Sequence, residues 1–251
     1  MGWGQERWIL NCTVPILQRR INRFLPYPLS LILAPKAKRA ENLFLHGFFG
    51  EKMENLRDYF DRHASSWDEM LKYGDKISEL SEVVNWFKLA EGHSVLDIGT
   101  GTGILLPLLR EAIGMEGKLI AIDFSFKMLE MAKPRQCLGE KVLINANAES
   151  LPFQSDLFDR IICFSVFPHF QNKAKALLEM VRVLKDGGTL FITHLKSVEE
   201  LNQFHRQLGG PIAHDFLPHP ARVKELMKDA GLFEISIINQ PGKFLAQGSK
   251  I

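Results

Sequence analysis

The spacing of hydrophobic positions along the chain changes at about residue 93. Residues 54–72, with a break near 63–66, and residues 76–90 carry apolar side chains at the spacing of amphipathic helices. Beyond them, short apolar runs alternate with segments of helical spacing. The apolar runs predict strands over 93–99, 118–123, 141–146, 159–165 and 188–195, and the intervening segments predict helices over 103–113, 125–135 and 171–184.

The C-terminal part of the chain has a different pattern. A predicted helix over 220–230 stops at Gly231, and two apolar stretches, 233–239 and 243–249, flank Gln240-Pro241-Gly242. Strands that alternate with helices specify a parallel sheet with right-handed crossovers, whereas two strands around a tight turn specify an antiparallel hairpin. The predicted fold is therefore α/β: a Rossmann-like, seven-stranded, mostly parallel sheet with a C-terminal antiparallel hairpin and helices on both faces.

Residues 1–52 differ in composition from the rest of the chain. The first fifty residues hold seven basic and two acidic side chains, a charge of +5 in a chain whose total is +2. We predict a poorly ordered basic extension over 1–52 and one catalytic domain over 53–251. Two interpretations of the extension stay open: a poorly ordered extension, including translation from a start upstream of a natural Met53, or a basic membrane-surface or targeting segment.

Overall composition narrows the class of protein. The net charge of +2 argues against a dedicated nucleic-acid binder. Three widely spaced cysteines show neither a disulfide framework nor a zinc knuckle, and Cys163 reads as a core residue. No apolar run reaches the roughly 18 residues that a membrane-spanning helix needs. A cytoplasmic protein is the expected class, with an oligomeric state that the sequence leaves open.

The most informative motif is Val95-Leu96-Asp97-Ile98-Gly99-Thr100-Gly101-Thr102-Gly103, at the end of the first predicted strand. Glycines here allow a sharp turn and a close approach to a ligand. The dinucleotide fingerprint would need another glycine at Ile104. Asp97 would also repel a pyrophosphate but suits a ligand that carries ammonium and sulfonium groups. The motif therefore favours S-adenosylmethionine (SAM) over a dinucleotide.

A second acidic residue supports the same ligand. Asp123 ends the next predicted strand, at the position where a carboxylate accepts the two hydroxyls of a ribose. The alternative role is a helix N-cap, for which Ser125 is equally available.

The five stretches VLDIGTGTG, AIDFSFKMLEMAK, NANAESLPF, FDRIICFSVFPHF and EMVRVLKDGGTLFITH occur in this order over about residues 54–249. In them the chain resembles the class I SAM-dependent methyltransferases, in particular the broad ubiquinone/menaquinone-type (methyltransferase type 11) group. The resemblance implies that Gly187-Gly188 form a turn and that Asn147 stands where the family usually has aspartate. It implies a cofactor site made of Asp97, Gly99, Gly101, Gly103, Asp123, Phe124, Met128, Asn147, Ala148, Glu149 and Phe164.

Histidines gather in the segment where this fold would bind its acceptor. His169 follows the fourth strand, His194 ends the fifth, and His205 and His214 lie in the irregular stretch beyond it. These four are the candidates for a general base, while His219 reads as the start of a helix. A metal or metalloid site that includes Asp215 is a competing interpretation, although the spacings match no metal signature and we predict no metal.

The sequence therefore predicts a SAM-dependent methyltransferase that transfers a methyl group to a small molecule by in-line displacement. Aromatic residues near the predicted acceptor region hint at an apolar, aromatic or quinone-like acceptor. The alternative is a SAM-binding sensor or assembly protein without transferase activity. A nucleic-acid partner is not expected, because the predicted catalytic part has no basic face.

Overall fold

A computed structural model describes residues 56–135, 139 and 141–251 of the chain. The predicted extension over 1–52, its basic segment and the domain boundary at Met53 lie outside these residues, so the membrane-contact hypothesis stays a prediction. No helix in the described part is long and apolar enough to cross a membrane.

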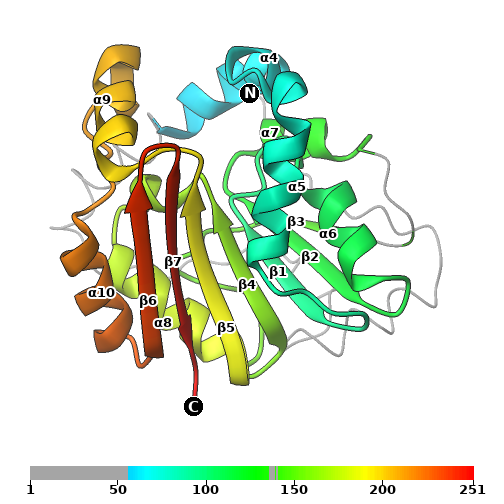
Figure 1. The fold of residues 1–251 in the computed structure, drawn as a ribbon. Helices are drawn as coiled ribbons and strands as arrows, with labels where there is room; N and C mark the ends of the chain where they lie inside the picture. Colours follow the sequence, from blue (N-terminus) through cyan, green and yellow to red (C-terminus); the bar gives the residue numbers. More distant parts are fainter. Residues whose placement is uncertain (1–55, 136–138, 140) are drawn as a thin grey trace, which may run out of the picture.

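Seven strands form one sheet, in the order β3-β2-β1-β4-β5-β7-β6. Neighbours among the first five pair in parallel, whereas β7 is antiparallel to both β5 and β6 (Figure 1). The fold prediction is confirmed, including the C-terminal hairpin. The strands are β1 (Ser94–Ile98), β2 (Lys118–Asp123), β3 (Lys141–Asn145), β4 (Phe158–Phe164), β5 (Leu184–His194), β6 (Phe233–Gln240) and β7 (Lys243–Ser249).

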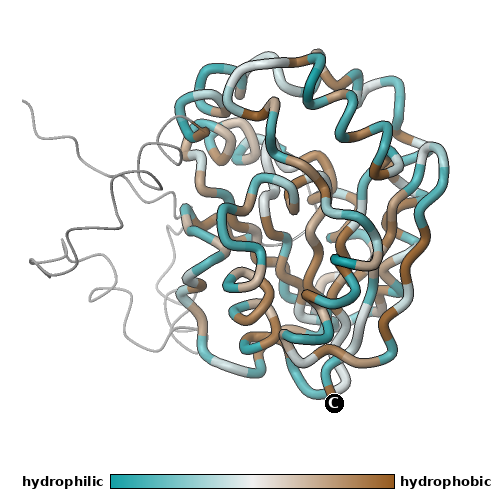
Figure 2. The backbone as a smooth tube through the Cα atoms, turned by 90° about the vertical axis from the view of Figure 1, so that its left-hand side faces the viewer, coloured by the Kyte–Doolittle hydropathy of each residue, from teal (hydrophilic) through white to brown (hydrophobic). Residues whose placement is uncertain are grey.

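Helices cover both faces of the sheet, because the central strands are apolar on both sides. One face carries α5 (Ile77–Trp86), α6 (Leu106–Ile113) and α7 (Phe126–Ala132). The other carries α8 (Lys173–Val183) and α10 (Pro220–Asp229). In Figure 2 hydrophobic segments follow the strands through the middle of the molecule, and hydrophilic segments lie mostly on outer helices and loops.

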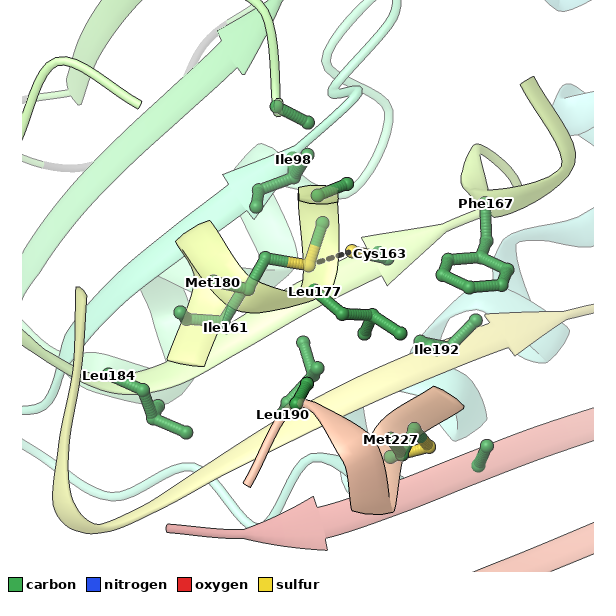
Figure 3. Packing of buried hydrophobic residues seen from close by; sticks show 14 of the residues in the cluster. Ile98, Ile161, Cys163, Phe167, Leu177, Met180, Leu184, Leu190, Ile192 and Met227 are labelled. Atoms are coloured by element: carbon green, nitrogen blue, oxygen red, sulfur yellow. Dashed lines mark hydrogen bonds between the residues drawn. The ribbon is translucent and has the colours of Figure 1, made fainter. Parts of the chain in front are cut away.

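The core on the α8 side of the sheet contains Cys163. Cys163 is fully buried, and its sulfur lies 3.7 Å from that of Met180 on α8 (Figure 3). Burial raises the pKa of this thiol well above its usual range, which makes the thiolate inaccessible. The sequence interpretation of Cys163 as a core residue is confirmed.

Short helices cover the edge of the sheet at which the parallel strands end (Figure 1). Residues 56–63 are helical and continue into η1 (Ala64–Ser66), α4 (Trp67–Met70) and η2 (Tyr73–Lys76). We call residues 56–76 the cap. On the other side of this edge, α9 (Val198–Leu208) leads into η4 (Gly210–Ile212). A capping box of Ser197 and Glu200 fixes the start of α9.

One local prediction is wrong. Gly187-Gly188 do not form a free turn before β5, because β5 already begins at Leu184, which pairs with Phe158 of β4. Gly187 instead has a positive φ of 74° inside the strand, and its N–H donates to the carbonyl of Lys250. The carbonyl of Gly188 in turn accepts the N–H of Lys250, so both glycines pair with Lys250.

Candidate functional site

The three glycines after β1 are glycines for different structural reasons. A Cβ on Gly99 would lie 2.2 Å from Cγ2 of Val166, and one on Gly103 would lie 2.9 Å from Cβ of Ala132. These two positions therefore need glycine for close packing. A Cβ on Gly101 would meet no heavy atom within 4 Å, because this residue borders open space. All three have positive φ, which favours glycine.

Asp97 lies beneath this turn. It is buried and is not among the residues that line the adjoining cavity. Desolvation raises the pKa of its carboxyl to about 7, and the nearby charge of Asp123 adds to the rise. Asp97 therefore lies behind the glycine turn rather than on the wall of the cavity.

Asp123 ends β2 beside the turn. Its carboxylate accepts the backbone N–H of Gly101 at 2.9 Å and that of Ser125 at 2.8 Å. Burial raises its pKa to about 6, although these two hydrogen bonds oppose the rise. Ser125 is the N-cap of α7, so the capping role belongs to Ser125. Asp123 is left to stabilise the glycine turn and to face the cavity that it lines.

A cavity of about 290 Å³ extends from the glycine turn to the ends of β4 and β5. Of the predicted cofactor residues, Gly99, Gly101, Asp123, Phe124, Met128 and Phe164 line it. A smaller lobe of about 40 Å³ shares Gly99, Asp123 and Phe124 with the cavity and is bordered by Asn147, Ala148 and Glu149. The structure thus brings together nearly all residues predicted to hold the cofactor.

Asn147 already has one fixed contact. Its side-chain oxygen accepts the N–H of Glu149 at 2.9 Å, which closes a local turn. An amide oxygen has two lone pairs, so one remains for a ligand.

Sequence reasoning missed the contribution of the cap. Its side chains Phe60, Trp67, Leu71 and Tyr73 line the large cavity. Polar contacts join the cap to the glycine turn and to the region of α7. Asp61 accepts the hydroxyl of Ser125 at 2.5 Å, and Asp68 contacts Thr102 and Arg135. The run of aromatic residues ahead of the first strand was the available signal.

Comparisons with known proteins agree with this geometry. Residues 96–192 match the family described as a methyltransferase domain. The chain is 28% identical over 225 residues to the ubiquinone/menaquinone biosynthesis C-methyltransferase UbiE of Francisella philomiragia, covering 78% of this chain and 90% of that protein. A SAM-dependent methyltransferase from Aquifex aeolicus is 25% identical, with a TM-score of 0.59 over 73% of this chain and 98% of that one.

The chain is a class I SAM-dependent methyltransferase. SAM is its cofactor. Its fold is also that of a Haloferax volcanii methyltransferase solved in complex with the Trm112 activator, at 22% identity and a TM-score of 0.64 over 76% of this chain and 96% of that one.

Two histidines of this methyltransferase meet at one aspartate. Nδ1 of His169, in η3 (Phe167–His169), lies 3.0 Å from Oδ2 of Asp215. Nδ1 of His205, on α9, lies 2.5 Å from the backbone carbonyl of Asp215. The two imidazole rings are 5.1 Å apart between centroids, and both border the large cavity. Asp215 was considered in the sequence only as a metal ligand.

His194, at the end of β5, borders the same cavity. It is buried, and neither ring nitrogen has a hydrogen-bond partner among the described residues. Desolvation, reinforced by the nearby His169 and His205, lowers its pKa to about 3. The ring is therefore neutral at physiological pH. A buried polar group without a partner costs about 1–3 kcal/mol, so this site is suited to a polar ligand atom.

The remaining candidates lie elsewhere in the methyltransferase. His214 is exposed and does not border the cavity. His219 is the N-cap of α10, as the sequence predicted, and accepts the N–H of Ala221 at 3.3 Å. Within the described ranges, no three His, Cys, Asp or Glu side chains are arranged to hold a metal ion, so the metal interpretation has no structural support.

Proposed function

We propose that the glycine turn and its surroundings hold SAM along the edge of the sheet. In this assignment Gly99 and Gly101 border the methionine portion, with Asp97 and Gly103 shaping the turn from below. Asp123 accepts the ribose hydroxyls. Phe124 and Met128 flank the adenine, and Asn147, Ala148 and Glu149 border its edge. Phe164 then lies beside the methyl group. The residues that line the two lobes support this placement.

We further propose that the acceptor is a small molecule bound between the ends of β4 and β5, the cap and α9. SAM supplies an activated methyl group on a sulfonium. The observation that carries the proposal is the His169–Asp215 pair, 3.0 Å apart, in the same cavity as the glycine turn. A carboxylate that orients an imidazole favours removal of a proton from the acceptor by His169. His194 and His205 complete the polar wall.

The character of the cavity favours an aromatic, quinol-like acceptor. Phe60, Trp67, Tyr73, Phe164 and Phe204 provide apolar surface. The UbiE relative is named as a C-methyltransferase of ubiquinone and menaquinone biosynthesis, which fits such a surface at 28% identity. Methylation at a ring carbon would need the same base to remove a ring or hydroxyl proton.

The first test is calorimetric titration of the full chain with SAM and S-adenosylhomocysteine (SAH). We expect both to bind, and Asp123→Ala to weaken binding by about 1.5–3 kcal/mol, the size of lost hydrogen bonds to a charged group. The matched control is Asp229→Ala, at the exposed end of α10, which should bind as the wild type does. A folded wild-type protein that binds neither ligand would refute the cofactor assignment.

The acceptor assignment is tested by a screen of phenols and quinols with methyl-labelled SAM. On an active compound, His169→Asn should lower kcat by about 10²–10⁴, the usual contribution of a general base. Unchanged turnover in His169→Asn would show that this residue is not the base.

A further inference from the structure

Asp215 contacts both cavity histidines through different atoms. It lies in the segment after η4, is 3% exposed, and is enclosed by the two rings that it contacts. Its side chain reaches Nδ1 of His169, while its main-chain carbonyl reaches Nδ1 of His205. One residue therefore fixes the orientation of two imidazoles that come from different elements.

The nature of these contacts determines where the histidine protons lie. A backbone carbonyl and an ionised carboxylate can only accept hydrogen bonds, so Nδ1 of each neutral ring must carry the hydrogen. The opposite nitrogen, Nε2, is then a bare acceptor in both rings. Both Nδ1 atoms are held by Asp215, which does not line the cavity, and both rings border the cavity, so Nε2 is the nitrogen of each ring that remains for a ligand.

We propose that Asp215 is a positioning residue that locks His169 and His205 in the Nδ1–H tautomer, so that this wall binds an uncharged acceptor with two neighbouring hydroxyl groups. The inference rests on the proposed function of the cavity and specifies the polar end of its acceptor. Two bare nitrogens on rings 5.1 Å apart, tilted by 32°, match two O–H donors on adjacent atoms.

His194 adds the complementary group. A neutral imidazole has one N–H donor and one acceptor, and both are unpartnered here among the described residues. A hydroxyl oxygen of the acceptor can take the N–H of His194 while its hydrogen is given to His169 or His205. A pair of hydroxyl groups thus satisfies Nε2 of His169, Nε2 of His205 and the N–H of His194.

The charged side chains around the cavity favour an acceptor with hydroxyl groups over an acceptor with an amine. The charged side chains that border the cavity within the described part are Lys72, Lys76, Lys196 and Asp123. Asp123 lies on the cofactor side and already accepts two backbone N–H groups. Even when the ionised Asp215 behind the rings is counted with these four side chains, their charges sum to +1, so an ammonium group would meet a net positive charge, whereas hydroxyls carry none.

The test is nitrogen NMR of the histidine side chains in the SAH-bound full chain at pH 8. We expect wild-type His169 and His205 to show a protonated Nδ1 and a bare Nε2. In Asp215→Asn the His169 signals should shift toward the Nε2–H tautomer, because an asparagine amide can donate to Nδ1. His205 should stay unchanged, because its partner is the main-chain carbonyl. A merely structural role for Asp215 would not separate the two rings in this way.

Asp229→Asn is the matched control, and exposed His219 is the internal reference; neither substitution should change the signals of His219. If Asp215→Asn does not fold, the wild-type spectrum alone decides: an Nε2–H tautomer at either ring overturns the proposal. Failure to bind SAH would instead refute the proposed cofactor function.

The acceptor part is tested with two probes on the same sample. 2,3-Dihydroxynaphthalene should shift the Nε2 signals of His169 and His205, and this shift should weaken at least tenfold in apparent affinity in Asp215→Asn. 2,3-Dimethoxynaphthalene, which has no O–H donors, should leave them unchanged. Equal shifts with both probes, or none with either, would overturn the assignment of a dihydroxylated acceptor.

Discussion

The ring of Phe60 stands edge-on to that of His169, with 5.1 Å between their centroids and 76° between their planes. Phe60 belongs to the cap, and it also packs edge-on against Phe124 at 5.7 Å. One cap side chain therefore touches both the proposed base and a residue of the proposed adenine site. The cap forms one wall of the site and joins its two halves.

Replacement of Phe60 should weaken both the fold and the site. Phe60 is 7% exposed, and removal of a buried phenylalanine costs about 3–5 kcal/mol. We expect Phe60→Ala to lower the free energy of unfolding by at least about 3 kcal/mol in urea titrations, and to weaken SAH binding. Phe233→Ala, at a position 52% exposed on β6, is the control and should cost below about 0.5 kcal/mol. Equal losses in the two variants would mean that the cap does not pack on the core.

The first glycine of the turn should tolerate alanine less well than the second. Both need a positive φ, which costs an alanine about 1–2 kcal/mol. Only Gly99→Ala adds a clash, with Val166 at 2.2 Å, worth about 1–3 kcal/mol more. Chemical denaturation should therefore rank Gly101→Ala above Gly99→Ala in stability, although alanine at either position should impair SAM binding. The reverse order of stability would contradict the packing described for Val166.

Acidification should destabilise the protein through His194. The pKa of His194 is about 3 in the folded protein and 6.5, the ordinary value, in the unfolded chain. Between pH 3 and pH 6.5 the unfolded chain therefore binds more protons than the folded protein does. Its stabilising contribution is thus complete above about pH 6.5 and is lost as pH falls toward 3. The raised pKa values of Asp97 and Asp123 act in the opposite direction, so the measured quantity must be a difference between variants.

The comparison is wild type against His194→Gln in urea at pH 4.5, 5.5, 6.5 and 7.5. The free-energy difference between them should change by up to about 1.4 kcal/mol per pH unit below pH 6.5 and become constant above it. Parallel pH profiles throughout would show that His194 is not buried in its neutral form.

Cofactor affinity should also depend on pH. The pKa of Asp123 is about 6, and only its ionised form is a strong acceptor for ribose hydroxyls. We expect the Kd of SAH to be constant from pH 8 to 7 and to rise by up to about tenfold per pH unit below 6. Asp123→Asn should bind more weakly at pH 8 and show a flatter profile. Calorimetry provides the measurement, and identical slopes for the two proteins would argue against the role of Asp123.

Much of the fold follows from local pattern. The predicted strand 118–123 matches β2 because an unbroken apolar run ends at an acidic residue followed by the N-cap Ser125. The hairpin was predicted from Gly242 in the turn between two apolar stretches. In the structure Gly242 has a φ of 75°, which permits the tight turn. The start of β5 is missed because Leu184 joins the sheet through an irregular register with β4, which depends on a partner strand rather than on local sequence.

That the proposed cofactor residues gather at one cavity follows from the sequence, since they come directly after the ends of β1, β2 and β3 in order. The acceptor side was not. His169 and His205 were both candidates for the base. Their contact with the same residue depends on the chain reversing direction between α9 and Asp215, which Gly209 and Gly210 permit because both have positive φ. No spacing rule predicts that one residue would bind both rings, or that neighbouring His214 would point outward.

The position of the cap in the sequence has a consequence for synthesis of the protein. The cap leaves the ribosome early, but its apolar residues pack against Met128 of α7 and Ile212 of η4, and Phe60 against His169. These contacts form only after most of the chain has been made, and such long-range pairings are slow to form. During translation, Tyr59, Phe60 and Trp67 therefore lack the residues that they pack against until Met128 and Ile212 have been synthesised. We therefore expect the nascent chain to expose this aromatic segment to chaperones until η4 has been synthesised, and the wall that the cap forms to be completed late in folding.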